Sequence, residues 1–186
     1  TVLVTGSKWF LGSFLVKELE KLCPKKIITP SSKELDLRDN SNCKKAVLDV
    51  DIVFHLAAQS RVQPSFEDPE ESLRVNVQGT LKVMEWAKKN SVKVLYAGSS
   101  SKHYDPSDSP YAMTKFLGEE ICKLYRKTYD IDVAISRFYN VYGPRQIQAG
   151  NMATVIGIFE KQYLDKKALT VVNPGLQTRK FTHVKD

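Results

Sequence analysis

The sequence predicts an α/β fold, a doubly wound parallel sheet with helices on both of its faces. Short apolar runs rich in β-branched residues alternate with segments whose apolar residues recur at helical spacing. Each crossover between parallel strands needs a helix, so such alternation is typical of a parallel sheet. The hydrophobic content of 42% and the charged content of 26% are those of a globular domain. We therefore expect one domain with a full core and the start of a second region.

The expected elements follow one another in a regular order. The strands are Thr1–Val4, Lys26–Thr29, Asp51–Leu56, Val92–Ala97, Asp132–Arg137 and Leu169–Val172. The helices cover residues 10–22, 40–48, 71–90, 110–129 and 151–166. The turn at Gly143-Pro144 is the clear break in this alternation. We therefore expect a first domain over residues 1–145 and the start of a further region over 146–186.

The first strand leads through a glycine-containing turn directly into a helix. The turn reads Thr5-Gly6-Ser7-Lys8-Trp9-Phe10-Leu11-Gly12, and apolar residues recur at helical spacing from Leu11 onward. The free N–H groups and the dipole of a helix start attract phosphate, and glycine lets the backbone approach it. The pattern indicates a dinucleotide site, although an ordinary strand-to-helix turn can show it too.

Tyr111 and Lys115 lie four residues apart in a predicted helix, so they share one face. An ammonium close to a phenol favours the phenolate and lowers its pKa, and such a Tyr can exchange a proton at neutral pH. Ser100 follows the strand Val92–Ala97, at the edge where open parallel sheets bind ligands. Taken singly, Tyr111 and Lys115 could be an exposed surface pair, and Ser100 could lie in an ordinary serine-rich loop.

Further motifs stand in a fixed order along the chain. They are Thr5–Gly12 (TGxxGxxG), Asp36–Asp39 (D-[IL]-x-[DN]), His55–Ala58, Asn76–Thr80 (NxxGT), Ser100–Tyr104 (SxxxY), Tyr111–Lys115 (YxxxK), Arg137–Pro144 (RxxN-[VL]-YGP) and Thr178–Val184 (R-[DE]-F-x-H-V). Together they resemble the extended short-chain dehydrogenases/reductases that act on nucleotide sugars, of the UDP-glucose 4-epimerase type. The resemblance covers essentially the whole chain, and it implies a Rossmann-type sheet that binds NAD or NADP.

The resemblance implies a role for each matching residue. Tyr111 would exchange the proton of a sugar hydroxyl, Lys115 would lower its pKa and bind the nicotinamide ribose, and Ser100 would bond the same oxygen. The residues implied to contact the cofactor are Gly6, Lys8, Trp9, Phe10, Leu11, Gly12, Ser31, Ser32, Asp36, Leu37, Leu56, Ala57, Ala58, Asn76, Tyr111 and Lys115. Those implied to hold the nucleotide sugar are Ser100, Ser101, Asn140 and Arg179. For Asn76 a structural role competes with direct contact, and no metal is implied.

The residues beside Ser100 favour epimerisation within this family. Dehydratases of the family carry an Asp-Glu pair directly after that hydroxyl, whereas this chain has Ser101-Lys102. We therefore expect 4-epimerisation of a UDP-hexose or other NDP-hexose by transient hydride transfer. An NADP-dependent nucleotide-sugar reductase or dehydratase is the alternative. A non-catalytic dinucleotide-binding sensor or scaffold protein is the alternative of another class.

The chain departs from the family pattern at several points. Trp9 stands at the middle glycine of the phosphate turn, so its indole must turn outward or displace the cofactor. The interval from Ser100 to Tyr111 is short, which leaves the identity of the sugar open. Relatives continue beyond the equivalent of Asp186, so residues 1–145 would be the NAD(P)-binding domain and 146–186 an incomplete substrate-binding region.

The choice between NAD and NADP depends on the end of the second strand. NAD sites usually place an acidic residue there to bind the ribose hydroxyls. Residues 29–33 offer hydroxyls and a lysine but no carboxylate before Glu34. This favours NADP, although the family's epimerases usually hold NAD.

Charge and cysteine content restrict the other partners. The net charge is +7, yet the lysines are dispersed and no basic run is interleaved with aromatic residues, so no nucleic-acid partner is expected. No apolar run approaches the ~18 residues of a membrane span. Three cysteines without metal-ligand spacing fit a reducing, cytoplasmic location. By analogy with the family, a homodimer could pair through the helices at 71–90 and 110–129. The apolar periodicity of these helices is also explained by their packing on the chain's own sheet.

Overall fold

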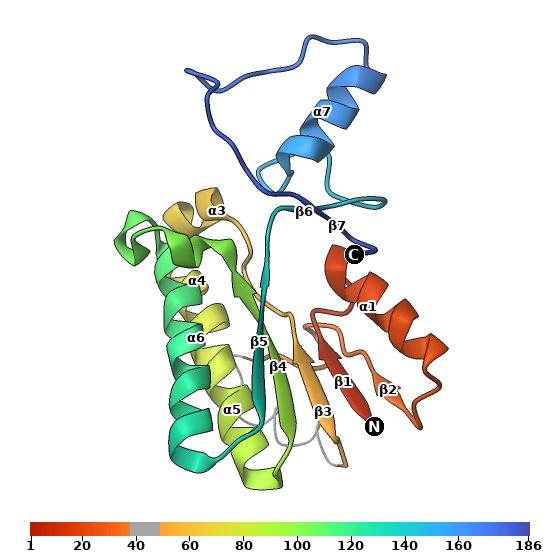
Figure 1. Ribbon diagram of the computed structural model, residues 1–186, viewed down its shortest axis with the longest axis vertical. Coiled ribbons are helices and arrows are strands. Elements are labelled where there is room, and N and C mark those ends of the chain that lie inside the picture. The colour runs from red at the N-terminus through yellow and green to blue at the C-terminus, as the bar shows by residue number, and fades with distance from the viewer. Residues whose placement is uncertain (38–48) are drawn as a thin grey trace.

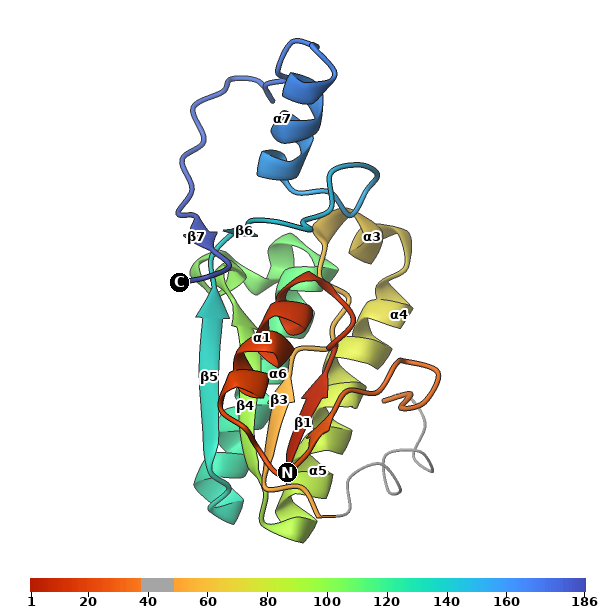
Figure 2. The same cartoon turned by 90° about the vertical axis from the view of Figure 1, so that its right-hand side faces the viewer.

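The computed structural model describes residues 1–37 and 49–186, so the helix expected at 40–48 lies outside the described residues. A five-stranded parallel sheet has the order β2-β1-β3-β4-β5 (Figure 1). Its strands are β1 (Val2–Thr5), β2 (Ile27–Ile28), β3 (Ile52–His55), β4 (Lys93–Ser99) and β5 (Val133–Phe138). Helix α1 (Phe10–Lys21) covers one face, and α5 (Gly79–Asn90) and α6 (Pro110–Tyr129) cover the other (Figure 2). The predicted doubly wound fold is confirmed.

The core lies on both faces of the sheet. Every residue of β1 is buried, as expected for a parallel strand covered from both sides. On the side of α5 and α6, Val53, Met84 and Cys122 are fully buried. On the side of α1, Val4 packs with Leu19. Burial of each such side chain contributes about 1.5–3 kcal/mol to the free energy of unfolding. The packed core holds the carboxyl ends of the strands along one edge of the sheet.

Helix α6 has the bounds that the sequence predicts. The Ser109 hydroxyl accepts a hydrogen bond from the Ala112 N–H at 3.1 Å, and Pro110 occupies the first helical position, where a missing N–H costs nothing. The helix ends at Asp130, whose φ of 54° is left-handed. This helix carries Tyr111 in its first turn and Lys115 in its second.

The helix expected at 71–90 is confirmed, because the chain is helical without a break from Pro69 to Asn90. This run consists of α4 (Pro69–Leu73), the π-helical turn η1 (Arg74–Gln78) and α5, and the short helix α3 (Val62–Glu67) precedes it. Asp68 separates α3 from α4 because its side chain accepts from the Glu71 N–H at 2.9 Å and Pro69 starts a new helix. The π turn contains Asn76, and such turns are frequent at functional sites.

After β5 the chain leaves the sheet. The strands β6 (Val141–Tyr142) and β7 (Thr182–His183) pair in parallel, and α7 (Val155–Leu164) lies above them (Figure 1). The strand expected at Leu169–Val172 is wrong, because this run pairs with no strand among residues 1–37 and 49–186, and Val172 is 77% exposed. The boundary at 145 stays a prediction.

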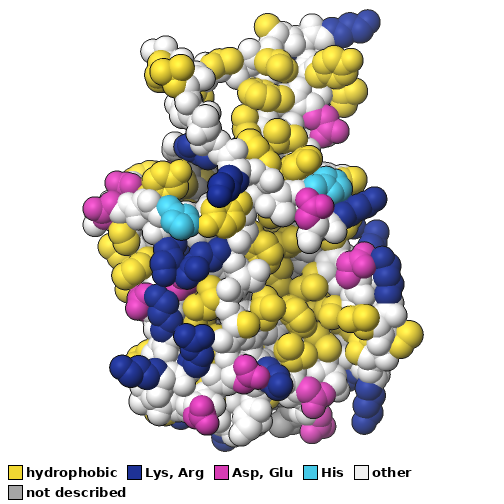
Figure 3. Space-filling view, viewed as in Figure 1, with side chains coloured by type: hydrophobic (Ala, Val, Ile, Leu, Met, Phe, Trp, Pro, Cys, Tyr) yellow, Lys and Arg dark blue, Asp and Glu magenta, His cyan; other side chains and the backbone are white. Residues whose placement is uncertain are grey.

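Hydrophobic side chains gather around α7 at the top of the molecule (Figure 3). Tyr163 and Leu164 are exposed there. An open groove under the helix is lined by Tyr142, Gly143, Pro144, Gln146, Ile156, Phe159, Glu160, Tyr163 and Leu169. In the described part of the chain, no helix has both the length and the apolar character needed to cross a membrane.

Candidate active site

The glycine turn after β1 is tightly packed. Gly6 has a φ of +74°, and a Cβ on it would lie 2.8 Å from the backbone nitrogen of Ala57. A Cβ on Gly12 would lie 2.2 Å from the Gly6 carbonyl oxygen. Trp9, the N-cap residue of α1, provides no side-chain hydrogen bond, and the first turn carries no acidic residue. The first amides of α1 are therefore available to an anion such as a pyrophosphate.

The indole of Trp9 turns outward, which is the first of the two expected outcomes. The side chain is 66% exposed, and its backbone is extended with φ −89° and ψ 170°. Nearby, the Ser7 hydroxyl is buried and has no hydrogen-bond partner among the described residues, so the turn holds an unsatisfied polar group. Lys8 is exposed, and Phe10 and Leu11 are partly buried at the start of α1. The residues present fit a dinucleotide pyrophosphate.

A carboxylate does lie near the end of β2, which the sequence alone does not reveal. Glu34 Oε2 accepts from both the backbone N–H and the hydroxyl of Ser31, each at 2.8 Å. The Ser31 backbone hydrogen bond holds the pKa of Glu34 below its usual value. Ser32 is exposed beside them. This carboxylate favours NAD over NADP, because an acidic residue near the end of the second strand suits ribose hydroxyls and repels an additional phosphate.

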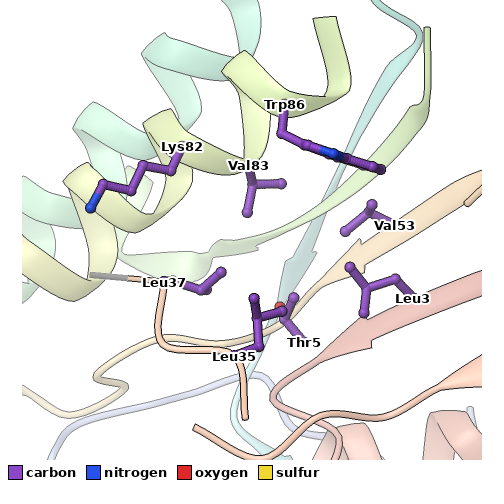
Figure 4. Close-up of a pocket in the computed structure, with 8 residues that line it drawn as sticks. All are labelled: Leu3, Thr5, Leu35, Leu37, Val53, Lys82, Val83 and Trp86. Carbon is purple, nitrogen blue, oxygen red and sulfur yellow. The ribbon is translucent and has the colours of Figure 1, made fainter. Parts of the chain in front are cut away.

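The side chain of Leu37 belongs to the core. It is 7% exposed and points into a small apolar pocket between the sheet and α5 (Figure 4). That pocket is also lined by Leu3, Thr5, Leu35, Val53, Lys82, Val83 and Trp86. Only the backbone of Leu37 could contact an adenine. Asp36 before it is partly buried.

The segment after β3 lies against the glycine turn. Leu56 and Ala57 donate their backbone N–H groups to the Thr5 carbonyl at 3.3 Å and the Thr5 hydroxyl at 3.2 Å. Ala58 follows and is partly buried. His55 contacts the hydroxyls of Thr5 and Thr80 at 2.9 and 3.2 Å, and burial lowers its pKa to about 3. The imidazole stays neutral and connects β1, β3 and α5.

The side chain of Asn76 forms three hydrogen bonds within the protein. Its side chain is 2% exposed. Its Oδ1 accepts from the Gln59 N–H at 2.8 Å, and its Nδ2 donates to the Gln59 carbonyl and to the Thr114 hydroxyl, both at 3.0 Å. Both amide hydrogens are used within the protein, which favours the structural role, and a direct cofactor contact stays a prediction. Asn76 fixes the segment after β3 to α6, the helix that carries Tyr111.

Tyr111 meets a serine hydroxyl at the carboxyl end of β4, but the serine is Ser99. The Tyr111 hydroxyl donates to Ser99 Oγ at 3.3 Å. Ser99 Oγ also accepts from the Ser101 N–H at 3.1 Å, so its own hydrogen is left to donate to a substrate oxygen. Ser100 starts the 3₁₀ helix η2 (Ser100–His103), and it stays a predicted substrate contact. The sequence offered three adjacent serines and no means to decide among them.

Lys115 does not acidify Tyr111 in this structure. The ammonium donates to the Ala97 carbonyl at 2.5 Å and lies 4.5 Å from the centre of the Tyr96 ring. Burial lowers the pKa of Lys115 to about 8. Burial also raises the pKa of Tyr111, while the Ser99 hydrogen bond and the charge of Arg61 oppose that rise. The expectation that Lys115 depresses this pKa is therefore corrected.

Arg61 is a residue that the sequence analysis missed. It precedes α3, it is partly buried, and its Nε donates to the Met152 carbonyl at 2.9 Å. Burial raises the pKa of the Tyr111 phenol, and the charge of Arg61 opposes that rise. No motif marks this arginine, because the contact joins segments 91 positions apart in the sequence.

Among the described residues, no hydrogen bond joins the side chains of Ser101, Asn140 and Arg179 to Tyr111. The Ser101 hydroxyl is buried without a partner among the described residues. Asn140 Nδ2 donates to the Lys180 carbonyl at 2.7 Å, which ties the end of β5 to the segment before β7. Arg179 is exposed and donates to the Thr178 carbonyl at 2.8 Å. Their roles toward a nucleotide sugar stay predictions.

Behind β4 lies a buried ion pair. Glu119 is 3% exposed in its side chain and receives hydrogen bonds from Arg137 at 2.7, 3.0 and 3.1 Å. Lys102 Nζ lies 3.8 Å from the same carboxylate. Lys102 occupies the position where dehydratases of the predicted family have an acidic residue, and here it faces this pair.

Comparisons with known proteins support one family. The model of the NAD-dependent epimerase/dehydratase family matches residues 2–186. The chain belongs to this family. A UDP-glucose 4-epimerase of Mycolicibacterium smegmatis is 32% identical over 99% of this chain and 69% of its own length. The chain thus spans about 69% of that relative.

Solved structures of the family resemble this chain closely. The UDP-N-acetylglucosamine 4-epimerase of Methanobrevibacter ruminantium, in complex with UDP-N-acetylmuramic acid, has a TM-score of 0.87 and 29% identity, covering 100% of this chain and 69% of its own. The UDP-glucuronic acid 4-epimerase of Bacillus cereus, in complex with UDP-glucuronic acid and NAD, has a TM-score of 0.81 and 27% identity. That match covers 99% of this chain and 69% of the structure.

Proposed function

We propose that the protein is an NAD-dependent nucleotide-sugar 4-epimerase that acts on a UDP-hexose or similar NDP-hexose. One observation carries the proposal: the Tyr111 hydroxyl meets Ser99 at 3.3 Å at the carboxyl edge of the sheet, with buried Lys115 one helical turn further along α6. Ligands of open parallel sheets bind at this edge. The three relatives described above are named as 4-epimerases of UDP-sugars, which supports the same conclusion.

NAD is the cofactor that the residues favour. The uncapped start of α1 would hold the pyrophosphate, and Glu34 would meet the ribose hydroxyls. When bound, NAD supplies the chemistry of accepting a hydride from the sugar and returning it to the other face. The protein's part is to orient the sugar and to move one proton.

The proton transfer is the task of Tyr111. The hydroxyl hydrogen of Ser99 would donate to the reacting sugar oxygen, which places that oxygen beside the phenol. Because burial raises the pKa of Tyr111, the phenol keeps its proton at neutral pH and can donate it to a ketosugar oxygen. Removal of the sugar proton needs the phenolate, which the Ser99 hydrogen bond and the charge of Arg61 favour.

Dehydration and a non-catalytic role receive less support. Expulsion of water needs an acid and a base beside the serines, and Lys102 there faces the buried Glu119 carboxylate instead. A pure sensor would not need a phenol hydrogen-bonded to a serine at the cofactor edge. We therefore place epimerisation first.

The test is a set of variants of the full-length protein assayed for UDP-glucose and UDP-galactose interconversion. Tyr111→Phe should reduce kcat by about 10²–10⁴-fold while denaturation still releases NAD from it. Ser99→Ala should reduce kcat by about 10²-fold, and Ser100→Ala should reduce it less. Two results together would contradict the proposal: the denatured protein releases no nucleotide, and Tyr111→Phe is as active as the parent on every sugar nucleotide.

We also propose a cytoplasmic homodimer that pairs through α5 and α6. Leu81, Phe116 and Leu124 on these helices are 41%, 37% and 54% exposed, which leaves apolar area for a partner. Cys23 and Cys122 are free thiols, in keeping with a reducing compartment. Light scattering after size-exclusion chromatography should give twice the mass of one chain for the parent protein. The Leu124→Lys variant should have the mass of one chain in the same measurement. A parent protein that runs as a monomer at micromolar concentration would contradict this.

A further inference from the structure

Glu119 lies on the same side of α6 as the two groups expected to take part in the reaction. It follows Lys115 by four residues and Tyr111 by eight, so the three side chains form one column along the helix. The side chain of Glu119 is only 3% exposed. Both charges of a buried ion pair lose hydration, so such a pair often adds no net stability to a fold. The position of this carboxylate therefore calls for an explanation other than stability.

The carboxylate of Glu119 lies directly against the backbone of β4. A Cβ on Gly98 would lie 2.7 Å from Glu119 Oε1 and 3.0 Å from Cγ of Arg137. Gly98 is the residue before Ser99, and the register of the sheet places it opposite Arg137 on β5. The Arg137 guanidinium donates to Glu119 at 2.7, 3.0 and 3.1 Å. Side chains of α6 and β5 thus meet over the peptide that leads into Ser99.

The turn that carries the serines adds a third charged group. Lys102 lies in η2, and its Nζ is 3.8 Å from Glu119 Oε2. The same turn begins with the hydrogen bond from the Ser101 N–H to Ser99 Oγ at 3.1 Å. It ends with the bond from the Tyr104 N–H to the Ser101 carbonyl at 3.0 Å. The lysine therefore attaches the whole turn to helix α6.

One carboxylate thus joins every element that supplies a reacting group. Helix α6 carries Tyr111, and β4 and η2 carry Ser99 and Ser100. The hydrogen bond from the Tyr111 hydroxyl to Ser99 Oγ is 3.3 Å long, beyond the ~2.5–3.0 Å usual for two hydroxyls. A small shift of α6 away from the serine turn would therefore break it.

We propose that Glu119 is a positioning residue which, through Arg137 and Lys102, sets the separation between the Tyr111 hydroxyl and the serine turn. This inference rests on the proposed epimerase function. The carboxylate is enclosed between α6, β4 and β5, so it acts through the phenol and the serines and not on the sugar.

The first test is the steady-state kinetics of UDP-glucose and UDP-galactose interconversion by the full-length, NAD-loaded protein. Glu119→Gln should lower kcat by about 10²-fold with KM nearly unchanged, which is the scale of a small misplacement of reacting groups. Lys102→Met should lower kcat by about 2–5-fold, and Lys102→Arg should restore it. Glu120→Gln is the matched control, because Glu120 is exposed on the same helix and pairs with Lys123. It should behave as the parent.

Two further readouts separate positioning from general support of the fold. The loss of kcat caused by Glu119→Gln should shrink when Ser99 is already replaced by alanine, because the two residues act through one contact. The second readout needs no substrate. In protein labelled with ¹³C in its tyrosine rings, the signal of Tyr111, assigned with Tyr111→Phe, should move in Glu119→Gln and in Lys102→Met. It should stay in place in the Glu120→Gln control.

Parental kcat values in Glu119→Gln and Lys102→Met, with an unmoved Tyr111 signal, would overturn the inference. An equal loss of kcat with and without the Ser99 hydroxyl would also overturn it. Should Glu119→Gln fail to fold, Lys102→Met decides, because it leaves the buried pair with Arg137 intact. A parent inactive on every UDP-sugar, whose Tyr111 signal still responds to both variants, would overturn the proposed function and support the positioning role.

Discussion

Replacement of Asn76 by alanine tests whether a buried amide holds the active site together. Three hydrogen bonds of 2.8, 3.0 and 3.0 Å would be lost, and the Gln59 N–H, the Gln59 carbonyl and the Thr114 hydroxyl would lose this partner. At about 1 kcal/mol for each bond, the free energy of unfolding should fall by about 3 kcal/mol. Typical domains have about 5–15 kcal/mol in total, so the variant should still fold.

The measurement is urea denaturation followed by far-UV circular dichroism. Asn90→Ala is the matched control, because its amide makes one bond of 2.9 Å to the Trp86 carbonyl and its loss should cost about 1 kcal/mol or less. Activity of Asn76→Ala should fall as well, because the Gln59 segment would no longer fix α6 and Tyr111. Equal stability losses in the Asn76 and Asn90 variants would refute the bracing role.

Three further predictions follow from the same structure. Gly118→Ala should destabilise the protein by several kcal/mol, on the order of a strong core clash, because its Cβ would lie 2.2 Å from the Tyr96 hydroxyl oxygen. Gly150→Ala is the comparison, because its Cβ would meet no atom within 4 Å and only the positive φ of Gly150 would cost stability. Equal denaturation midpoints of the two variants would contradict this prediction. Lys115, with its pKa lowered to about 8 in the folded state, binds fewer protons there than in the unfolded state, so stability should rise with pH. From pH 8 to 10 the rise should be about 2 kcal/mol in the parent and absent in Lys115→Met, and parallel pH profiles would rule out the lowered pKa. NAD should change the fluorescence of exposed Trp9 in a Trp86→Phe background, and an unchanged spectrum at saturating NAD would place the indole away from the cofactor.

The sequence predicted the parallel sheet and helix α6 well, because local signals decide them. The bounds of α6 are predicted by local signals, namely the Ser109 hydroxyl, the proline that follows it and the helical spacing of apolar residues. The failed strand at Leu169–Val172 shows the limit of such signals. Its β-branched residues fit a strand, but a strand also needs a neighbouring strand, and this run pairs with none in the part of the chain that the structure describes.

The site was predicted in outline, and its details depend on contacts between remote segments. Tyr111 and Lys115 could be found from their spacing. Which serine bonds the Tyr111 hydroxyl depends on where β4 ends. The hydrogen bonds between Glu34 and Ser31 depend on the conformation of a turn. The position of Arg61 depends on how α3 and the segment around Met152 meet, which no local pattern encodes.

The short parallel pair β6 and β7 has a consequence for how this enzyme family can diversify. Val141 lies opposite Thr182, so a long excursion of the chain departs from and returns to one point above the sheet. The ends of such a loop are fixed in place, and its closure entropy grows only slowly with length. Residues can be added or lost between these anchors at little thermodynamic cost, so new sugar pockets can arise while the phenol, the amine and the glycine turn keep their positions.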